Sequence, residues 1–296
     1  MPPQLKDALA GAVARLTAAD VPSPRMNAEL LLTFTLDCDR AYFFAHPERV
    51  LTQDEIVRYD YALAERSRGV PAQYITGHQE FWGMDLIVTP AVLIPRPETE
   101  HVIETVLELQ APASGVRHPA DGSQKPESGS RIVDVGTGSG CIAFALAKEL
   151  KDAEIYATDI SAAALEIARI NAVRNQLESR IQFREGDLLA GFENDSFDFI
   201  VSNPPYVGES EADDVQLEVR KFEPRNAVFA GPGGVEVIER LIPQAHAALK
   251  PGGWLIMEIS GTIAEEVRSL LRDWNEISIR PDLQSIPRVV QARKSP

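Results

Sequence analysis

From residue 131 onward, the sequence alternates short apolar runs with segments of helical periodicity. The apolar runs lie at 132–135, 154–158, 181–184, 197–201 and 254–259, and the helical segments at 141–150, 162–174, 235–249 and 265–274. Two late runs, 277–279 and 288–291, are typical of an antiparallel pair of strands. Repeated strand–helix units fold into a doubly wound, mostly parallel sheet that binds ligands at the carboxyl ends of its strands. The sequence therefore predicts an α/β domain whose functional residues follow its strands.

The first 75 residues have a different, helical pattern. Leu5, Leu9, Val13 and Leu16 recur at helical spacing, and the segment 52–55 fits a capping box at the start of a later helix. We expect a small helical bundle over 1–75.

Two short apolar runs around Gly83 predict a β-hairpin linker over 76–95, which leaves 96–296 as the α/β domain. Within that domain, residues 110–130 are rich in Pro, Gly and Ser and have no hydrophobic anchor. We expect this segment to be a mobile loop.

Charge and composition exclude several classes of protein. The 296 residues include 29 Lys and Arg against 44 Asp and Glu, a net charge of −15. This deficit argues against direct binding of nucleic acid and against attachment to an acidic membrane surface. No apolar stretch reaches the roughly 18 residues of a spanning helix, the N-terminus lacks a signal-peptide pattern, and the two cysteines, Cys38 and Cys141, lie far apart. We expect a cytoplasmic monomer and, because neither His78 nor His101 has a second ligand at metal spacing, no metal site.

A glycine-rich segment, Asp134-Val135-Gly136-Thr137-Gly138-Ser139-Gly140, follows the first strand and precedes a helix. Its G-x-G-x-G spacing differs from the G-x-G-x-x-G of dinucleotide sites, and a tight turn without a ligand is the remaining alternative. Asp159 ends the next strand, where a carboxylate can accept both hydroxyls of a ribose. With Asp134 near a sulfonium and an amino group, the set suits S-adenosylmethionine better than a pyrophosphate. Asp187, after the third strand, is either an adenine acceptor or a turn residue.

The tetrapeptide Asn203-Pro204-Pro205-Tyr206 directly follows another strand. Its prolines lack backbone donors, which leaves the Pro204 carbonyl and the Asn203 side-chain oxygen as acceptors for the two hydrogens of a planar NH2 group. Tyr206 offers a flat face to an amide or a base. Positioning and electrostatics then suffice for methyl transfer to nitrogen, without a strong base.

These two motifs resemble those of class I S-adenosylmethionine-dependent methyltransferases that act on amino or amide nitrogen. Further segments carry the resemblance: Leu93-Ile94-Pro95-Arg96-Pro97-Glu98-Thr99-Glu100, Gln73–Gly77 with Glu80–Gly83, and Phe222-Glu223-Pro224-Arg225. With them, nearly the whole chain is similar to the release-factor glutamine methyltransferases of the HemK/PrmC type. The resemblance implies a Rossmann-like, seven-stranded sheet with an N-terminal helical docking domain. It also implies S-adenosylmethionine as cofactor and, as substrate, the side-chain amide nitrogen (N5) of the glutamine in the Gly-Gly-Gln motif of peptide chain release factors.

The resemblance implies roles for individual residues as well. Gly136, Thr137, Gly138, Ser139, Gly140, Asp159, Asp187 and Leu188 would bind the cofactor. Asn203 would contact both cofactor and substrate, while Pro204, Pro205 and Tyr206 would grip the glutamine. Leu188 stands where the family commonly has a large aromatic residue. Arg96 is either a clamp on the methionine carboxylate or the substrate backbone, or the partner of Glu98 or Glu100 in an ion pair.

Three other functions are consistent with parts of this pattern. An exocyclic amino group of nucleic acid offers the same two hydrogens, but residues 1–75 have 8 basic and 10 acidic side chains and the remainder has 21 and 34. A ribosomal-protein glutamine is a second alternative, for which we expect Pro-Arg-Ser in place of Pro-Arg-Pro. A binding or scaffold protein without activity is the third.

Overall fold

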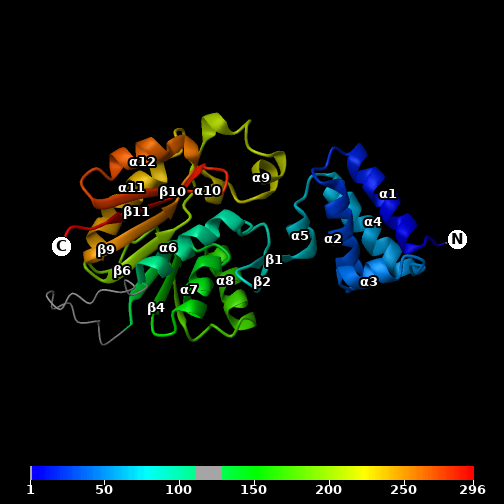
Figure 1. Cartoon of the computed structure of the whole chain (residues 1–296), viewed down its shortest axis with the longest axis horizontal. Helices are drawn as coiled ribbons and strands as arrows, with labels where there is room; N and C mark the ends of the chain where they lie inside the picture. The colour runs from blue at the N-terminus through cyan, green and yellow to red at the C-terminus, as the bar shows by residue number, and fades with distance from the viewer. Residues whose placement is uncertain (1, 111–128) are drawn as a thin grey trace. The chain divides into compact units, whose positions relative to one another are not determined.

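The computed structural model describes residues 2–110 and 129–296, which divide into two compact units (Figure 1). Met1–His78 and Gln216–Phe222 form the first unit, and Gln79–Val215 and Glu223–Pro296 form the second. The mobile loop expected at 110–130 falls almost wholly at 111–128, outside the described residues. No helix in the described part of the chain is long and apolar enough to cross a membrane.

The first unit is helical. Its helices are α1 (Leu5–Ala18), α2 (Pro24–Leu36), α3 (Arg40–Ala45), α4 (Gln53–Ser67), α5 (Ala72–Thr76) and α9 (Leu217–Phe222). The capping box forms as the sequence predicts, because the Thr52 hydroxyl accepts from the Glu55 amide and the Glu55 carboxylate accepts from the Thr52 amide. Leu5, Leu9 and Leu16 lie in the core that α1 shares with α2 and α4.

Helix α9 belongs to this unit although it lies far along the chain. Glu218 of α9 forms an ion pair with the nearly buried Arg66 guanidinium at 2.8 Å. The chain therefore leaves the second unit after the Asn-Pro-Pro-Tyr segment and returns to it before Glu223. Nothing in the sequence pattern indicates this excursion.

The predicted hairpin consists of β1 (His78–Phe81) and β2 (Met84–Ile87). Its two turn residues, Trp82 and Gly83, have φ values of 53° and 67°. Positive φ at both central positions defines the type I′ turn, which matches the twist of the adjoining strands.

The second unit is built on a seven-stranded sheet in the order β10-β11-β9-β6-β3-β4-β5. Its strands are β3 (Arg131–Val135), β4 (Glu154–Asp159), β5 (Ile181–Glu185), β6 (Phe197–Ser202), β9 (Leu249–Glu258), β10 (Asn275–Pro281) and β11 (Pro287–Arg293). The strands from β3 to β9 pair in parallel, whereas β11 and β10 pair antiparallel. The prediction of a mostly parallel sheet with a late antiparallel pair is confirmed. A small parallel pair, β7 (Val207–Gly208) with β8 (Phe229–Gly231), lies apart from it.

Helices cover both faces of this sheet (Figure 1). One face packs against α6 (Glu100–Gln110), α7 (Cys141–Glu149) and α8 (Ala162–Arg174), and the other against α11 (Glu236–Ala248) and α12 (Ala264–Leu270). The pleat directs Ile132 into the first core and Val133 into the second. The central strand β3 is therefore buried on both sides, which explains its continuous apolar run. Shorter helical turns are η1 (Pro97–Thr99), η2 (Glu209–Glu211), α10 (Arg225–Val228) and η3 (Gly261–Ile263).

Strand β9 differs from the predicted strand at 254–259. It begins at Leu249, so that Pro251, Gly252 and Gly253 lie within it rather than before it. The register with β6 shifts between Phe197 and Phe199, and Gly252 has a φ of 78°. This irregularity accommodates residues that would otherwise end a strand.

Candidate active site

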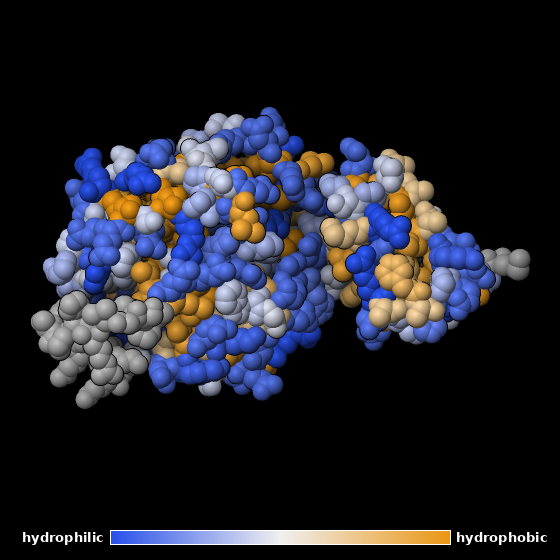
Figure 2. Space-filling model, viewed as in Figure 1, coloured by the Kyte–Doolittle hydropathy of each residue, from blue (hydrophilic) through white to orange (hydrophobic). Residues whose placement is uncertain are grey.

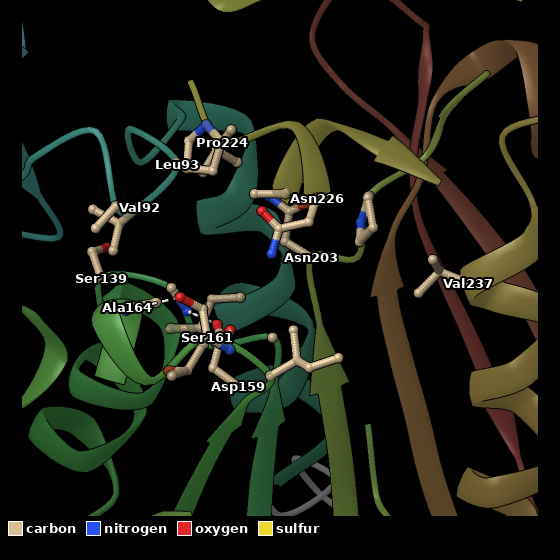
Figure 3. Close-up of a pocket in the computed structure, with 18 of the residues that line it drawn as sticks. Val92, Leu93, Ser139, Asp159, Ser161, Ala164, Asn203, Pro224, Asn226 and Val237 are labelled. Carbon is tan, nitrogen blue, oxygen red and sulfur yellow. Dashed lines mark hydrogen bonds between the residues drawn. The ribbon is translucent and has the colours of Figure 1, made fainter. Parts of the chain in front are cut away.

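A cavity of about 280 Å3 lies at the carboxyl ends of the parallel strands. Segments that follow four different strands line it: Gly136–Ser139 after β3, Asp159–Ser161 after β4, Gly186–Leu188 after β5, and Asn203 with Pro205 after β6. In Figure 3, Asn203, Asn226 and Pro224 lie across the cavity from Asp159 and Ser161. Because the strand order reverses between β3 and β6, the cavity occupies the switch point of the sheet, where such folds bind ligands.

The glycine-rich loop keeps the wall of this cavity open. Gly136 and Gly138 have φ values of 72° and 56°, and a Cβ built on either would meet no atom within 4 Å. These glycines therefore serve the backbone conformation and leave room for a ligand. Gly140 also has a positive φ, of 91°, and serves packing as well, since a Cβ there would come within 2.2 Å of the Phe144 ring.

Asp134 lies under this loop and is only 1% exposed. Its Oδ2 accepts from the Thr137 hydroxyl at 2.6 Å and from the Ala143 amide at 3.2 Å. Its Oδ1 is buried and has no hydrogen-bond partner among the described residues. Burial raises the pKa of the Asp134 carboxyl to about 7. An unsatisfied carboxylate oxygen of this kind suits a ligand with a cationic or hydrogen-donating group.

Asp159 ends β4 at the edge of the cavity. Its Oδ2 accepts from the Gly138 amide and its Oδ1 from the Ser161 amide, both at 2.9 Å. Each carboxylate oxygen can accept a further hydrogen bond, so the pair suits the two hydroxyls of a ribose. Burial raises the pKa of Asp159, and the backbone amides that donate to it oppose this effect.

Asp187 and Leu188 also line the cavity. The Asp187 carboxylate forms an ion pair with Arg240, another lining residue. Leu188 has a φ of 55°, a left-handed conformation that is uncommon for a residue other than glycine. These residues mark the side of the cavity next to β5.

Only two of the four residues of the Asn-Pro-Pro-Tyr segment line the cavity. Asn203 and Pro205 line it, and the Asn203 Nδ2 donates to the Thr99 hydroxyl at 3.1 Å. Pro204 is buried, and the Tyr206 hydroxyl donates to Glu258 Oε1 at 3.0 Å. Burial, with Glu258 adjacent, raises the pKa of Tyr206, so its hydroxyl remains protonated and a donor.

Arg96 forms its ion pair with Glu223, at 2.5 Å, and not with either of the two glutamates suggested by the sequence. The second oxygen of Glu223 accepts from the Ile94 amide at 3.2 Å. The carboxylate of Glu223, in the Phe-Glu-Pro-Arg segment, thus holds the Pro-Arg-Pro segment in place. Pro95 of that segment and the nearby Thr99 line the cavity.

Sequence reasoning assigned no role to Thr99, Asn226 or Glu258, all of which belong to this region. Thr99 and Asn226 line the cavity, and Glu258 bonds both Thr99 and Tyr206. One signal was available for Glu258: it is a carboxylate at the carboxyl end of an otherwise apolar strand. Thr99 lies in the Leu93–Glu100 segment that carries the family resemblance, whereas Asn226 has no comparable signal.

The lining fits S-adenosylmethionine. Asp159 is placed to bond ribose hydroxyls, and the open backbone of Gly136 and Gly138 admits close approach. Asp134 does not line the cavity; it lies buried beneath the loop, with its Oδ1 unpartnered among the described residues. Within the described residues, no cluster of three His, Cys, Asp or Glu side chains has a geometry that would hold a metal ion.

Comparison with solved structures supports the fold. The hMettl16 catalytic domain, solved in complex with the MAT2A 3'UTR hairpin 1, aligns with a TM-score of 0.54 over 84% of this chain and 86% of that one, at 16% identity. At this identity the likeness shows the fold alone. Fold and site together define a class I S-adenosylmethionine-dependent methyltransferase.

Sequence comparisons narrow the class to a family. Residues 7–77 match the family model of the PrmC N-terminal domain, and residues 123–221 match that of the methyltransferase small domain. The release factor glutamine methyltransferase of Koribacter versatilis is 56% identical over 98% of each chain. The proteins of the same name from Deinococcus radiodurans and Moorella thermoacetica are 38% identical over 99% of each chain and 41% identical over 90% of this chain and 89% of theirs. The chain belongs to the release factor glutamine methyltransferase family.

Proposed function

We propose that this protein transfers the methyl group of S-adenosylmethionine to the side-chain amide nitrogen, N5, of the glutamine in the Gly-Gly-Gln motif of peptide chain release factors. The observation that carries the proposal is the position of Asn203. Its amide lies at the cavity next to the glycine-rich loop, with the nitrogen already bonded to Thr99. The amide oxygen is thereby left as an acceptor for a substrate NH2 group.

When bound, S-adenosylmethionine supplies an electrophilic methyl carbon on a sulfonium that is a good leaving group. The Asn203 oxygen and the Pro204 carbonyl accept the two hydrogens of the glutamine amide, so that electron density on its nitrogen points at that carbon. The Tyr206 ring packs against the planar amide. The N–C bond forms as the C–S bond breaks, and the extra proton on nitrogen passes to water. Positioning and electrostatics supply the catalysis.

For the cofactor, we propose that residues Gly136–Gly140 offer backbone contacts and that Asp159 accepts from the ribose hydroxyls. Asp134 would stabilise the cationic end through its unsatisfied Oδ1. Asp187 and Leu188 would border the adenine. Arg96 is bound to Glu223, so its role in substrate binding would be to fix the segment that lines the cavity.

The test is methyl transfer from radiolabelled S-adenosylmethionine to a purified release factor. We expect label on the factor, and none on a variant whose Gly-Gly-Gln glutamine is replaced by alanine. Label on a ribosomal protein, on RNA or on DNA, with none on the release factor, would overturn the proposal in favour of the corresponding alternative.

We further propose that residues 1–75 are the docking domain for the release factor, with 76–95 as linker and 96–296 as catalytic domain. Helix α2 exposes an apolar row at positions i, i+4 and i+8, in which Met26 is 66%, Leu30 42% and Phe34 47% exposed. Figure 2 shows apolar side chains on the surface of the helical unit. Contiguous exposed apolar side chains are typical of a surface that binds another protein.

Phe34→Ser should therefore raise the KM for the intact release factor by about tenfold, the loss expected for one apolar contact at an interface. The same variant should leave the rate with a short Gly-Gly-Gln peptide unchanged, because the peptide lacks the docking contacts. Val173→Ser, which removes an exposed apolar side chain of α8, is the control. An equal effect of Phe34→Ser on both substrates would contradict the docking proposal.

A release-factor substrate places the protein in the cytoplasm, and both cysteines, Cys38 and Cys141, are free thiols. Cell fractionation tests the location, and sedimentation of the purified protein tests the expected monomer.

A further inference from the structure

We propose that Thr99 and Glu258 are positioning residues that fix which end of the Asn203 amide faces the substrate. This inference rests on the proposed methyl transfer at Asn203 and adds the side chains that orient that residue. Its basis is a chain of hydrogen bonds that runs from Glu258 through Thr99 to Asn203.

The topology brings the two ends of this chain together. Strands β6 and β9 pair in parallel with Ser202 opposite Met257, so the next residues, Asn203 and Glu258, leave adjacent strand ends on the same side of the sheet. Thr99, at the end of η1, bonds both of them: its hydroxyl donates to Glu258 Oε2 at 2.6 Å and accepts from Asn203 Nδ2 at 3.1 Å.

The direction of each hydrogen bond follows from the acceptors at Glu258. Its two carboxyl oxygens accept from the hydroxyls of Thr99 and Tyr206. The Thr99 hydroxyl has a single hydrogen and donates it to Glu258, so it can only accept from Asn203. A lone pair binds the NH2 end of an amide and not its oxygen. The Asn203 oxygen is consequently directed away from Thr99 and is available to the substrate. The hydrogen bond from Thr99 to Glu258 thus selects one of the two orientations of the Asn203 amide.

The burial of Glu258 does not contribute to the stability of the fold in the way that an apolar side chain would. It is 1% exposed, as is Thr99, and burying a carboxylate costs more free energy than burying an apolar side chain of similar size. Burial raises the pKa of Glu258, while the hydroxyls of Thr99 and Tyr206 favour its ionised form. The second oxygen of Glu258 accepts from Tyr206, so the same carboxylate also fixes the ring proposed to pack on the substrate amide. One buried carboxyl group therefore orients two residues of the Asn-Pro-Pro-Tyr segment.

Thr99→Val is the direct test, because valine has the shape of threonine without its hydroxyl. We expect kcat, at saturating S-adenosylmethionine and release factor, to fall about 100-fold, as when one oriented hydrogen-bonding group of an active site is lost. Thr99→Ser restores the hydroxyl and should recover about a third or more of the wild-type kcat. The matched control is Thr105→Val, since Thr105 is equally buried and its hydroxyl donates only to the backbone oxygen of His101.

Glu258→Gln provides a second variant if Thr99→Val does not fold. A glutamine NH2 group can donate to Thr99, which then donates to Asn203 and reverses its amide. We expect a loss in kcat of about 10- to 100-fold, and the double variant with Thr99→Val should lose about as much as the more impaired single variant, because both act on one amide.

A structural readout separates orientation from general damage. In 15N-labelled protein without cofactor, the side-chain NH2 signals of Asn203 should shift in Thr99→Val and Glu258→Gln and stay in place in Thr105→Val.

The inference is overturned if active wild-type enzyme and Thr99→Val have the same kcat, if Thr99→Ser is as impaired as Thr99→Val, or if the Asn203 signals do not move. A wild-type enzyme that leaves the release factor unmethylated would instead overturn the proposed function, and the Asn203 signals would still test the hydrogen bonding.

Discussion

The two sides of the cavity are built in different ways. On the side of the glycine-rich loop, most contacts join residues close in sequence: Asp134 bonds the side chain of Thr137 and the amide of Ala143, three and nine residues away. On the Asn203 side, the contacts join side chains that are 52 to 159 residues apart. The first side depends on backbone conformation, and the second depends on side chains that the sheet brings together. Substitutions on the two sides should therefore affect different measured quantities.

The largest effect is expected on the Asn203 side of the cavity. Asn203→Ala removes one of the two acceptors proposed for the substrate amide, and we expect kcat to fall about 1000-fold, the upper range for loss of one such group. Single-turnover methylation of a release factor measures it, with circular dichroism to show that the fold persists. A rise in KM with an unchanged kcat would contradict the assignment, because it would mean that Asn203 contributes binding alone.

An intermediate effect is expected on the side of the glycine-rich loop. Gly138→Ala puts a side chain on a residue with a φ of 56°, at a point where the free protein has open space. The conformational strain should lower the free energy of unfolding by only about 1 kcal/mol. The new methyl group would occupy space that we propose the cofactor fills, so we expect the Kd for S-adenosylmethionine to rise by at least about tenfold. Gly11→Ala, with equally open space in α1 and an ordinary φ, is the control.

Unchanged affinity in Gly138→Ala would show that the cofactor does not approach this part of the loop. The two sides would then differ less than the geometry indicates.

The last effect concerns Asp134 and is a dependence of stability on pH rather than of activity. The pKa of Asp134 is about 7 in the folded protein, whereas the ordinary value of 3.8 applies to the unfolded chain. Between these two pH values, the folded state therefore holds a proton that the unfolded state has released. Stability therefore falls as pH rises through this window, by up to about 1.4 kcal/mol per pH unit. Asp134→Asn should remove this contribution. Urea unfolding of both proteins without cofactor, at pH 5, 6, 7 and 8, gives the difference.

The free energy of unfolding of the wild type, relative to that of Asp134→Asn, should fall as pH rises to about 7. Above pH 7 it should stay constant, because Asp134 is then ionised in both the folded and the unfolded protein. Parallel pH profiles for the two proteins would show that burial does not perturb this carboxyl.

The sequence predicted most of the catalytic fold, because that information is local. A continuous apolar run defines a strand buried on both faces, as in β3, and a glycine-rich turn defines the passage from a strand to a helix, as at Gly136–Gly140. The sequence misplaced the start of β9, where pairing with β6 extends a strand through Pro251 and two glycines. It also gave no sign that α9 joins the helical unit, since that depends on contacts between distant segments, such as the ion pair of Glu218 with Arg66.

By itself, then, the sequence determined the order of strands and helices, the residues that follow each strand, and the chemistry that an Asn-Pro-Pro-Tyr segment offers to an amide. Tertiary structure alone decided which side chains meet there. The partner of Arg96 is Glu223, and the partners of Asn203 and Tyr206 are Thr99 and Glu258. These pairs depend on the register of β6 with β9 and on the place where η1 packs, and neither is encoded within any short stretch of the chain.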